Sequence, residues 1–567
     1  MPPEFVPYPF TAERHAPVVP PLREGMDVGR RPVVVVGGGP VGYCAALGLA
    51  NHGVPVVLLE ADDSVCFGSR AICISRRSLE IADRLGALPG FLETGLPWTG
   101  GRSYYRDAEV LHFRMPQDEN QKLPPMVNLA QYSIEQILLY RAEERRDLID
   151  IRWQNRVTAI EARADGVSLT VSTPASDYRL EAEWVVAADG GRSFIREALG
   201  LQLRGTSYEG RYVIVDILLE SDRPTERLAY FDPACNPGST VLVHKQPNNV
   251  WRIDYQLRDG EDPDEAIKPE NVLPRVESLQ AMMGEKKPWK PIWTGIYKAN
   301  ALTLDSYRHG RVLFAGDAAH LVPIFGVRGA NSGIDDADNL AWKLAFVVQG
   351  VASEKLLDSY SAERVAATHE NLSYGTKSTE FMAPPSFAFE LMRTAVLSLA
   401  SRHPALSSLI NPRQTTAITY ARSPLNGAGD DESGGGPVPG AVLPECPLTI
   451  TSEGRRREGH VTDLLTLGAR PGFTALLFGD GDGPPAWLQD LERSLAARGV
   501  PFKLVPIARR ADAKGAAAWD HTGRLFKLYQ ATPGTVYLVR PDGHLLGRWR
   551  APRPTELLAA IERALGR

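Results

Sequence analysis

Cysteine is scarce in this chain, and its arrangement excludes several kinds of chemistry. The 567 residues contain 5 cysteines, none in a Cys-x-x-Cys pair and none at zinc-like spacing from a histidine. We therefore expect no metal site and no disulfide framework. A scattered, odd set of thiols fits a reducing compartment, so the expected location is cytoplasmic.

Long apolar runs and basic tracts are also missing. The apolar runs reach only the length of a strand or a core helix, so no membrane span is expected. The formal net charge is −5, and no basic tract is interleaved with aromatic residues, which argues against nucleic acid as a partner. Residues 1–30 are rich in proline and charge but lack the apolar segment of a signal peptide. We expect them to form a disordered or surface-lying arm.

What the chain does contain is a dinucleotide-binding fingerprint. An apolar run, residues 32–36, is typical of a buried parallel strand. Gly37, Gly39 and Gly42 follow at once, ahead of a run with helical spacing. These glycines allow a tight turn, close approach of a pyrophosphate, and close packing of helix on strand. A second apolar strand ends in Glu60, whose carboxylate can accept hydrogen bonds from a ribose diol.

Two further motifs lie at the ends of later strands. The apolar run 184–188 ends in Asp189 and two glycines. Far downstream, the run 311–315 leads into Asp317 and a glycine-rich loop, before a helix expected at 334–349. A domain that binds only a nicotinamide dinucleotide has no need of these motifs.

The three motifs together resemble those of the group A flavoprotein monooxygenases, the p-hydroxybenzoate hydroxylase family. The resemblance covers about residues 31–364 and includes the element Tyr360-x-x-Glu363-Arg364. The strings at 69–73 and 539–543 favour the hydroxyphenylpropionate hydroxylase and phenol hydroxylase branch.

The resemblance implies an α/β fold with a Rossmann-like FAD-binding domain and an inserted antiparallel-sheet substrate domain. We expect the first part of the FAD-binding domain in residues 31–204 and the substrate sheet in 205–300. Residues 301–425 then return to the FAD-binding domain and add closing helices. A linker rich in glycine, proline and acidic residues follows at 426–440, and residues 441–567 resemble a thioredoxin-like C-terminal domain.

Thiol chemistry is not expected in the C-terminal domain. A thioredoxin carries Cys-x-x-Cys after its first strand, and this chain has Gly479–Asp482 there. Pro533 stands where thioredoxins hold a cis-proline. The domain is therefore expected to be structural or to form the contact of a homodimer.

The resemblance also implies which side chains contact FAD. Asp317 is expected to accept a hydrogen bond from the ribityl hydroxyl. Asp189 is expected near the pyrophosphate, with a part in NAD(P)H binding. Gln131 matches the family's FAD-contacting glutamine, and Arg70 matches its early arginine near the cofactor.

The loop before the helix at 334–349 is expected to tune the flavin. Backbone amides of Gly329, Ala330 and Asn331 would approach the flavin N1–C2=O edge, where the positive end of a helix stabilises reduced flavin. The family usually has two prolines here, but this chain has only Pro323 before an isoleucine, so part of the rigidity is lost. Arg328 has three open roles: charge near the flavin, a partner for a substrate carboxylate, or a structural ion pair.

The implied reaction is hydroxylation of a phenolic or related electron-rich aromatic compound. In the family NAD(P)H, with NADPH slightly preferred here, reduces FAD, and O2 then forms a C4a-hydroperoxide that transfers OH. A free phenol ionises near about pH 10, so the site must supply a base, positive charge or a proton relay. The candidates in the expected sheet are His244, Arg252, Tyr255, Lys245 and Tyr230.

Two other functions remain open. The same fold serves oxidative tailoring of polycyclic aromatic natural products. A non-catalytic flavin-binding interaction protein is the second alternative, although a complete Gly316-Asp317 loop argues against it. A flavin halogenase is disfavoured because its Trp-x-Trp-x-Ile-Pro motif is missing.

Overall fold

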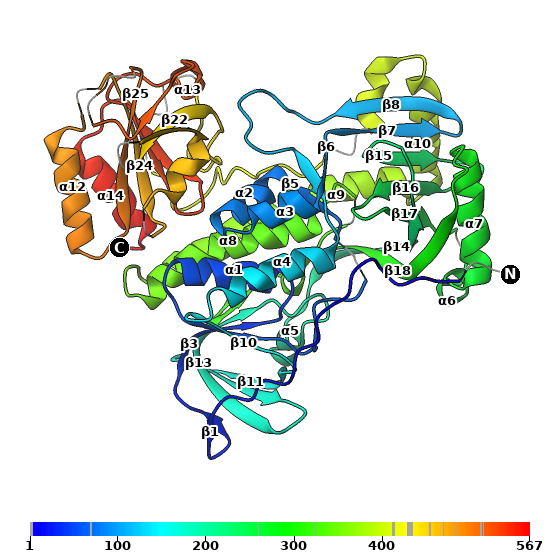
Figure 1. Ribbon diagram of the computed structural model, residues 1–567, viewed down its shortest axis with the longest axis horizontal. Helices are drawn as coiled ribbons and strands as arrows, with labels where there is room; N and C mark the ends of the chain where they lie inside the picture. Colours follow the sequence, from blue (N-terminus) through cyan, green and yellow to red (C-terminus); the bar gives the residue numbers. More distant parts are fainter. Residues whose placement is uncertain are drawn as a thin grey trace.

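The molecule has three lobes, arranged side by side in Figure 1. The computed structural model describes residues 4–68, 71–258, 260–323, 325–410, 414–427, 435–452, 455–468, 470–481, 483–510, 513 and 515–567. The lobe with the glycine fingerprint lies in the centre and below, the sheet expected to cover a substrate (called here the substrate sheet) at the right, and the C-terminal lobe at the left. The expected mixed α/β architecture with several sheets is confirmed.

The central lobe is built on parallel strands in the order β20-β13-β3-β4-β10. The valines of β3 are almost fully buried, as expected for a parallel strand covered on both faces. The strands are β3 (Arg31–Val36), β4 (Val56–Leu59), β10 (Ile149–Arg152), β13 (Asp177–Ala187) and β20 (Val312–Phe314). An antiparallel hairpin, β11 (Arg156–Ala162) and β12 (Val167–Ser172), pairs with the first half of β13.

Helices cover the upper side of this sheet (Figure 1). They are α1 (Pro40–Asn51), α2 (Arg76–Arg84), α3 (Leu88–Thr94), α4 (Gln131–Glu143) and α8 (Gly329–Val348). A small sheet of β5 (Cys73–Ser75), β9 (Met126–Asn128) and β6 (Leu96–Trp98) lies beside them. The remaining short elements of the lobe are α5 (Phe194–Ala198) and β19 (Arg308–His309).

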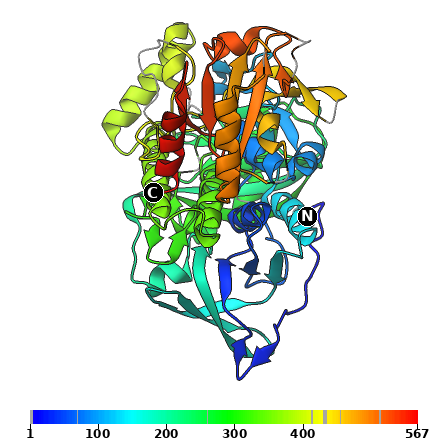
Figure 2. The ribbon, with the colours of Figure 1, turned by 90° about the vertical axis from the view of Figure 1, so that its left-hand side faces the viewer.

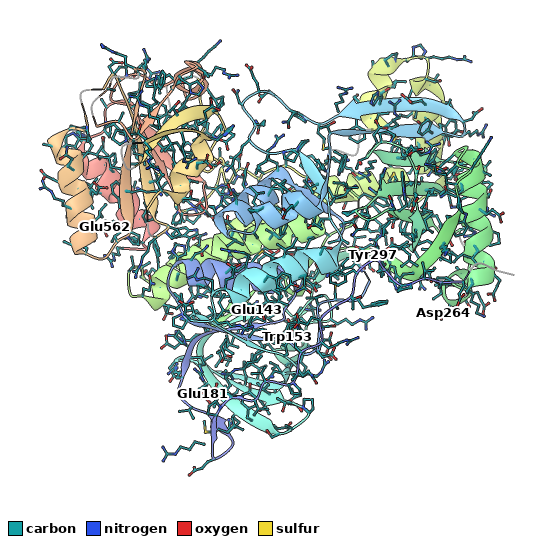
Figure 3. The ribbon with its side chains drawn as sticks, in the orientation of Figure 1. Glu143, Trp153, Glu181, Asp264, Tyr297 and Glu562 are labelled. Carbon is teal, nitrogen blue, oxygen red and sulfur yellow. The ribbon has the colours of Figure 1, made fainter. Side chains whose placement is uncertain are left out.

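Residues 4–30 form an extended arm that crosses the central lobe and reaches the substrate sheet. The backbone amide of Val6 donates to the Pro291 carbonyl (2.9 Å), and the ring of His15 stacks on Trp153, which Figure 3 labels. The arm ends in a hairpin, β1 (Leu22–Arg23) and β2 (Met26–Asp27), at the sheet edge. Figure 2 shows the arm running down the outside of the lobe.

The substrate sheet has eight strands in the order β21-β18-β14-β17-β16-β15-β7-β8. They are β7 (Gly100–Tyr105), β8 (Ala108–Arg114), β14 (Arg204–Leu219), β15 (Arg227–Phe231), β16 (Thr240–Lys245), β17 (Val250–Gln256), β18 (Trp289–Thr303) and β21 (His320–Leu321). The hairpin of β7 and β8 comes from the segment assigned above to the FAD-binding domain. It joins this sheet because β7 pairs in parallel with β15, which leaves β8 at the edge.

The strands β15, β16 and β17 are buried on both faces, whereas the alternation in β17 predicts a half-buried sheet. On one face, Trp251, Ile253 and Tyr255 pack under α7 (Pro269–Met282), next to α6 (Pro263–Ala266). On the other face Arg252 is 2% and Asp254 7% exposed. The polar side of β17 therefore faces the protein interior and not solvent.

Three further helices follow α8, the first packed against α8 and β18 and the other two beside β8. They are α9 (Leu356–Met382), α10 (Phe387–Ala400) and α11 (Ser407–Ile410). Tyr297 of β18, labelled in Figure 3, donates from its hydroxyl to the Val322 carbonyl at 3.3 Å. This contact joins the sheet to the loop that precedes α8.

The C-terminal lobe has a seven-stranded sheet in the order β23-β22-β26-β25-β24-β27-β28. Its strands are β22 (Pro447–Ser452), β23 (Arg455–His460), β24 (Phe473–Gly479), β25 (Phe502–Ala508), β26 (Ala518–Trp519), β27 (Val536–Val539) and β28 (Leu545–Trp549). The helices are α12 (Ala486–Ala497), α13 (Arg524–Leu528) and α14 (Pro554–Ala564). No cis peptide bond occurs in the part of the chain that the structure describes, so Pro533 does not follow the expected cis pattern.

Buried charges join this lobe to α8 and α9. Arg540 donates to both carboxylate oxygens of Glu363 (2.7 and 3.0 Å) and to Asp542. Lys343 donates to Glu363 at 2.7 Å, and the Trp342 indole donates to Asp542 at 3.0 Å. We call Arg540, Asp542, Glu363 and Lys343 the docking network.

Within the expected linker, residues 428–434 lie outside the described residues.

Candidate functional site

The glycine fingerprint has the geometry that a bound pyrophosphate requires. Gly37 has a φ of +109°, and a side chain there would collide with the Ala188 carbonyl. A side chain at Gly42 would collide with the Gly37 carbonyl. At Gly39, nothing lies within 4 Å of the position of a Cβ atom, so the start of α1 opens onto free space. The first amides of α1 face that space without helical partners.

Glu60 is held in place at the end of β4. Its carboxylate accepts hydrogen bonds from the Gly38 amide (2.6 Å) and the Asp62 amide (2.7 Å). Burial raises its pKa, and these amides oppose the rise. The carboxylate therefore lies directly beside the turn that would hold the pyrophosphate, where a ribose is expected.

Asp189 offers an incomplete carboxylate in the same region. Its Oδ2 accepts from the Ile195 amide at 3.1 Å, while its Oδ1 is buried with no partner among the described residues. Burial raises its pKa. Arg196 then joins this loop to the next motif, because its guanidinium donates to the carbonyls of Gly191 (2.7 Å) and Ala318 (2.9 Å).

Hydrogen bonds to Asp336 of α8 hold the loop that contains Asp317. The Gly316 amide and His320 Nε2 both bond to Asp336 Oδ2, at 3.0 and 2.7 Å. Arg364 completes the anchor through Asp336 Oδ1 at 2.6 Å. Asp317 itself is exposed although both its neighbours are buried. The carboxylate thus faces outward at a strand end, as a ligand contact requires.

Helix α8 begins at Gly329, earlier than the expected start at Ile334. Asn331 explains the difference, because its side chain bonds to the Ser75 amide, the Cys73 carbonyl and the Val327 carbonyl at 2.6–3.0 Å. The amides of Gly329, Ala330 and Asn331 therefore belong to a first helical turn, where they lack intrahelical acceptors. The Asn331 side chain braces the loop and leaves only its backbone for a cofactor.

Two loop residues are turned towards α9. Pro323 packs at Gly375, whose Cβ position lies 3.3 Å from the proline ring. Arg328 is 3% exposed, donates to Asn371 Oδ1 at 3.0 Å and lies over the ring of Tyr374. Burial lowers the pKa of Arg328 to about 10. Of its three expected roles, the contacts with Asn371 and Tyr374 fit the structural one best, although both partners are uncharged.

Gln131 stands at the start of α4 and links two segments. Its Oε1 accepts from the Ala71 amide (3.3 Å), and its Nε2 donates to Glu135 (2.9 Å). Glu135 accepts from the Cys66 amide at 2.7 Å, and burial raises its pKa to about 7. Arg70 lies outside the described residues, so its expected contact has no structural account.

These features fit FAD. The open turn at Gly39, the incomplete carboxylate of Asp189 and the outward-facing Asp317 all lie at carboxyl ends of neighbouring parallel strands. Such ends are where α/β sheets bind their ligands. Gly37, Gly42 and Glu60 shape the turn, and the first turn of α8 lies beyond it.

A row of buried polar side chains crosses the substrate sheet on the face opposite α7. The strand register pairs Arg227 with His244, His244 with Arg252, and Arg252 with Asp216. We call these four residues the polar row. Arg252 and Asp216 form a two-bonded ion pair at 2.7 and 2.8 Å, and the Tyr8 hydroxyl from the N-terminal arm donates to Asp216.

The other end of the polar row is incompletely bonded. Arg227 is 4% exposed, yet the one hydrogen bond found for its guanidinium is to Gln414 Oε1, at 3.1 Å. Its Nε and the Nδ1 of His244 are buried without partners among the described residues, as is Gln414 Nε2. Burial lowers the pKa of His244, and Arg227 and Arg252 lower it further.

Asp254 lies beside this row and was not among the candidates from the sequence. The register places it next to Leu242 and Ile214, one position along from the polar row. No hydrogen bond to its carboxylate is found among the described residues, and burial raises its pKa to about 7. Only its place in the alternation of β17, shared with Arg252, could have singled it out.

Three of the residues considered for phenol activation are turned away from this face. Tyr255 lies under α7 with the Arg275 guanidinium over its ring, because it alternates with Asp254. Tyr230 stacks on Tyr104 on the same covered side. Lys245 donates to the carbonyls of Ser221 and Arg223. The structure therefore corrects the expectation for Tyr255, while His244 and Arg252 lie on the inner face.

The inner face lies against the loop that starts α8. Ala229 and Leu242, the register neighbours of the polar row, pack with Phe325. The Thr415 amide donates to the Gly326 carbonyl at 2.9 Å, next to Gln414 and hence to Arg227. Cys73, whose carbonyl is bonded to Asn331, feels the charges of Arg227, Arg252 and Asp254. The inner face of the sheet and the loop before α8 are therefore packed against each other.

Comparison with known proteins agrees with this geometry. Residues 30–373 match the family model described as an FAD binding domain. The chain is 28% identical to a 3-(3-hydroxy-phenyl)propionate/3-hydroxycinnamic acid hydroxylase of Mycolicibacterium smegmatis, over 93% of this chain and 92% of that protein. It is also 28% identical to a 6-methylpretetramide 4-monooxygenase of Streptomyces rimosus, over 96% and 94%.

Among solved structures, the flavin-dependent monooxygenase PieE in complex with FAD and substrate has the same fold. The TM-score is 0.80 at 22% identity, and the match covers 95% of this chain and 99% of PieE. With the family model spanning more than half of the sequence, the chain belongs to the FAD-binding domain family and is an FAD-dependent monooxygenase of the group that its three motifs resemble.

Proposed function

We propose that this enzyme hydroxylates a phenolic aromatic compound, with NAD(P)H as reductant and O2 as the source of oxygen. The observation that carries the proposal is the buried, incompletely bonded polar row on the sheet face packed against the loop before α8. Buried polar groups are normally satisfied, so a cluster of open donors and acceptors points to a polar ligand. A phenol that must be activated next to a cofactor is such a ligand.

The chain's own residues would divide the work. Gly37, Gly39, Gly42, Glu60 and Asp189 would hold the dinucleotide, and Asp317 its ribityl chain. FAD, when bound, supplies hydride acceptance from NAD(P)H and the activation of O2. The amides of α8 would favour negative charge on the reduced ring, and the inner face of the substrate sheet would bind and orient the aromatic ring.

The curated relatives support a phenolic substrate but leave its size open. One carries the name of a 3-(3-hydroxy-phenyl)propionate/3-hydroxycinnamic acid hydroxylase, and the other that of a 6-methylpretetramide 4-monooxygenase. Because both match nearly the whole chain, tailoring of a polycyclic aromatic compound remains the second candidate. A non-catalytic role loses support from both names.

Anaerobic reduction of the bound flavin tests the proposal. NADPH and NADH would each be mixed with the holoenzyme, with and without single-ring and polycyclic phenols, and flavin absorbance followed. We expect one phenol class to accelerate reduction, NADPH to be slightly preferred, and labelled O2 to add one labelled oxygen atom to that phenol. Flavin reduction without any oxygenated product from the whole panel would refute the proposed activity.

We also propose that the C-terminal lobe is a redox-inactive, thioredoxin-like domain. In support, β24 and β25 are parallel neighbours joined through α12, and β27 and β28 add an antiparallel pair before α14. The two residues that replace thioredoxin's thiols, Gly479 and Asp482, cannot form a disulfide. We retain the homodimer as a proposal, to be checked by sedimentation of the holoenzyme.

A further inference from the structure

Among the described residues of the substrate sheet, one buried carboxylate and one buried guanidinium form no close ion pair. Arg252 and Asp216 neutralise each other in a two-bonded pair, which Tyr8 closes. Asp254 and Arg227 have no such counterpart among the described residues. Both are at least nine-tenths buried, at 7% and 4% exposed. An uncommitted charge of this kind is costly unless a ligand or a proton compensates it.

The charged and titratable neighbours of Asp254 come from several strands. Arg252 lies on its own strand, Asp216 on β14, His244 on β16, Arg227 on β15, and Cys73 on β5. The nearby His244 is held neutral, because burial and the two arginines lower its pKa. Burial likewise raises the pKa of the Cys73 thiol to about 12. Asp254 is therefore the group on this face that can take up a proton near neutral pH.

Resting on the proposed function, we infer that Asp254 accepts the proton of the substrate phenol and that Arg227 holds the resulting phenolate. The phenol O–H bond breaks, and its electron pair stays on the phenol oxygen. The proton forms a new O–H bond with an Asp254 carboxylate oxygen. The summed charge of the two groups is unchanged, and the negative charge moves from the carboxylate to an oxygen that the Arg227 guanidinium can contact.

Gln414 would act as a positioning residue for Arg227. Its Oε1 accepts from Arg227 Nη1 at 3.1 Å, which leaves Nε and the remaining guanidinium donors for a ligand. The backbone amide of the neighbouring Thr415 donates to the Gly326 carbonyl. This bond fixes the position of Gln414, and through it that of Arg227, relative to the loop before α8. The site would therefore hold the activated oxygen at a fixed place relative to the cofactor end.

The first test follows ionisation directly. Phenolate absorbance of bound 3-(3-hydroxyphenyl)propionate and of bound 3-ethylphenol would be titrated against pH in the FAD-loaded enzyme. We expect both probes to ionise well below their free value in the wild type, and Asp254→Asn and Arg227→Met each to shift that ionisation upward. A shift in Arg227→Met confined to the carboxylate-bearing probe would overturn the assignment of Arg227 to the phenolate.

The second test follows turnover. Asp254→Asn should lower kcat near neutral pH by about 100-fold, the usual contribution of a general base. The loss should shrink as pH rises towards the phenol's own pKa of about 10, and Asp254→Glu should restore part of the rate. In the wild type, kcat/KM should rise as pH increases through about 7, because Asp254 must be ionised to accept a proton.

Tyr255→Phe is the matched control, because Tyr255 is the next residue of β17 and faces α7. It should leave both the ionisation and the pH profile unchanged. Flavin content and melting temperature would confirm that each variant is folded. If the wild type hydroxylates a phenol but Asp254→Asn keeps its ionisation and pH profile, the inference fails and the proposed function stands. If the wild type oxygenates no phenol, both fail.

Discussion

Arg540 and Arg227 are both buried arginines, but their surroundings differ in kind. Arg540 meets two carboxylates, Glu363 and Asp542, with charge-assisted hydrogen bonds to each. Arg227 donates to one neutral amide oxygen and forms no close ion pair among the described residues, although the charge of Asp254 acts on it. The first arrangement is complete without any ligand. The second becomes complete only when something anionic arrives.

The carboxylates in the two regions differ in the same sense. Although burial opposes ionisation of Glu363, Arg540 and Lys343 hold its pKa well below the ordinary value. Burial raises the pKa of Asp254 to about 7, although the charge of Arg252, which is paired with Asp216, opposes the rise. Arg540, Asp542 and Glu363 of the docking network therefore keep fixed charges that hold two lobes together, whereas burial lowers the pKa of their partner Lys343 to about 8. The substrate face keeps a charge that can change, which is what proton transfer needs.

Breaking the complete arrangement should have the largest effect. Arg540→Ala leaves Glu363 and Asp542 buried without their main partner, so we expect unfolding free energy to fall by about 3–5 kcal/mol. Urea unfolding of the holoenzyme measures this. Arg553→Ala is the control, since Arg553 pairs with Glu556 at the surface and should leave the midpoint unchanged. Equal urea midpoints for Arg540→Ala and Arg553→Ala would show that the buried charges of the docking network add no more stability than a surface ion pair.

Removing the incomplete charge should act on binding and not on folding. Arg227→Met replaces an unpaired buried charge with an apolar chain of similar length, so stability should be equal or higher. The loss of a charged hydrogen bond, about 1.5–3 kcal/mol, should raise the KM for a phenol about 10- to 100-fold. If Arg227→Met lost as much stability as Arg540→Ala but bound phenol normally, Arg227 would serve folding and not binding.

Asp317 extends the comparison to a cofactor contact. Asp317→Ala removes a carboxylate that is exposed in the structure and leaves a ribityl hydroxyl unpaired. We expect the FAD dissociation constant to rise about 5- to 100-fold, equivalent to about 1–3 kcal/mol, with little change in apoprotein stability. Flavin fluorescence during reconstitution measures the FAD dissociation constant of each variant. Asp305→Ala, at another exposed loop carboxylate, is the control and should bind FAD as the wild type does.

The smallest effect is expected for Cys446→Ser. Cys446 is buried in the C-terminal lobe, and all five cysteines are free thiols. With no second thiol to form a disulfide, turnover and its dependence on NAD(P)H should not change. An inactive but folded variant would show that the C-terminal lobe carries electrons after all.

The sequence predicted the strand, the glycine turn and the helix of the fingerprint because their signals are local. Gly37, Gly42 and Glu60 act within one turn between consecutive strands, so spacing along the chain reflects spacing in space. The C-terminal strands at 473–478 and 502–508 were predictable for the same reason. The start of α8 was not, because Asn331 obtains its bonds from β5, far away in the sequence.

The substrate half could be predicted only in part. Alternation correctly separated Arg252 from Tyr255, but it could not tell which face is inward, since both faces are buried. The pairing of Arg227 with His244 depends on strand register, and the neighbour of Arg227, Gln414, lies almost two hundred positions away. Asp254 carries no motif of its own. Its raised pKa comes mainly from burial, which only the folded sheet creates.

The 20 residues of α8 connect the two regions mechanically. At its usual rise the helix is about 30 Å long, and about 20 Å separate its first turn from Trp342 and Lys343 at the C-terminal lobe. Coupling between two binding events is reciprocal. If docking of the lobe orders this rod, then loss of FAD must loosen the lobe by the same free energy. Trp342, bonded to Asp542 across the interface, would then be a fluorescent reporter of cofactor occupancy at the far end of the helix.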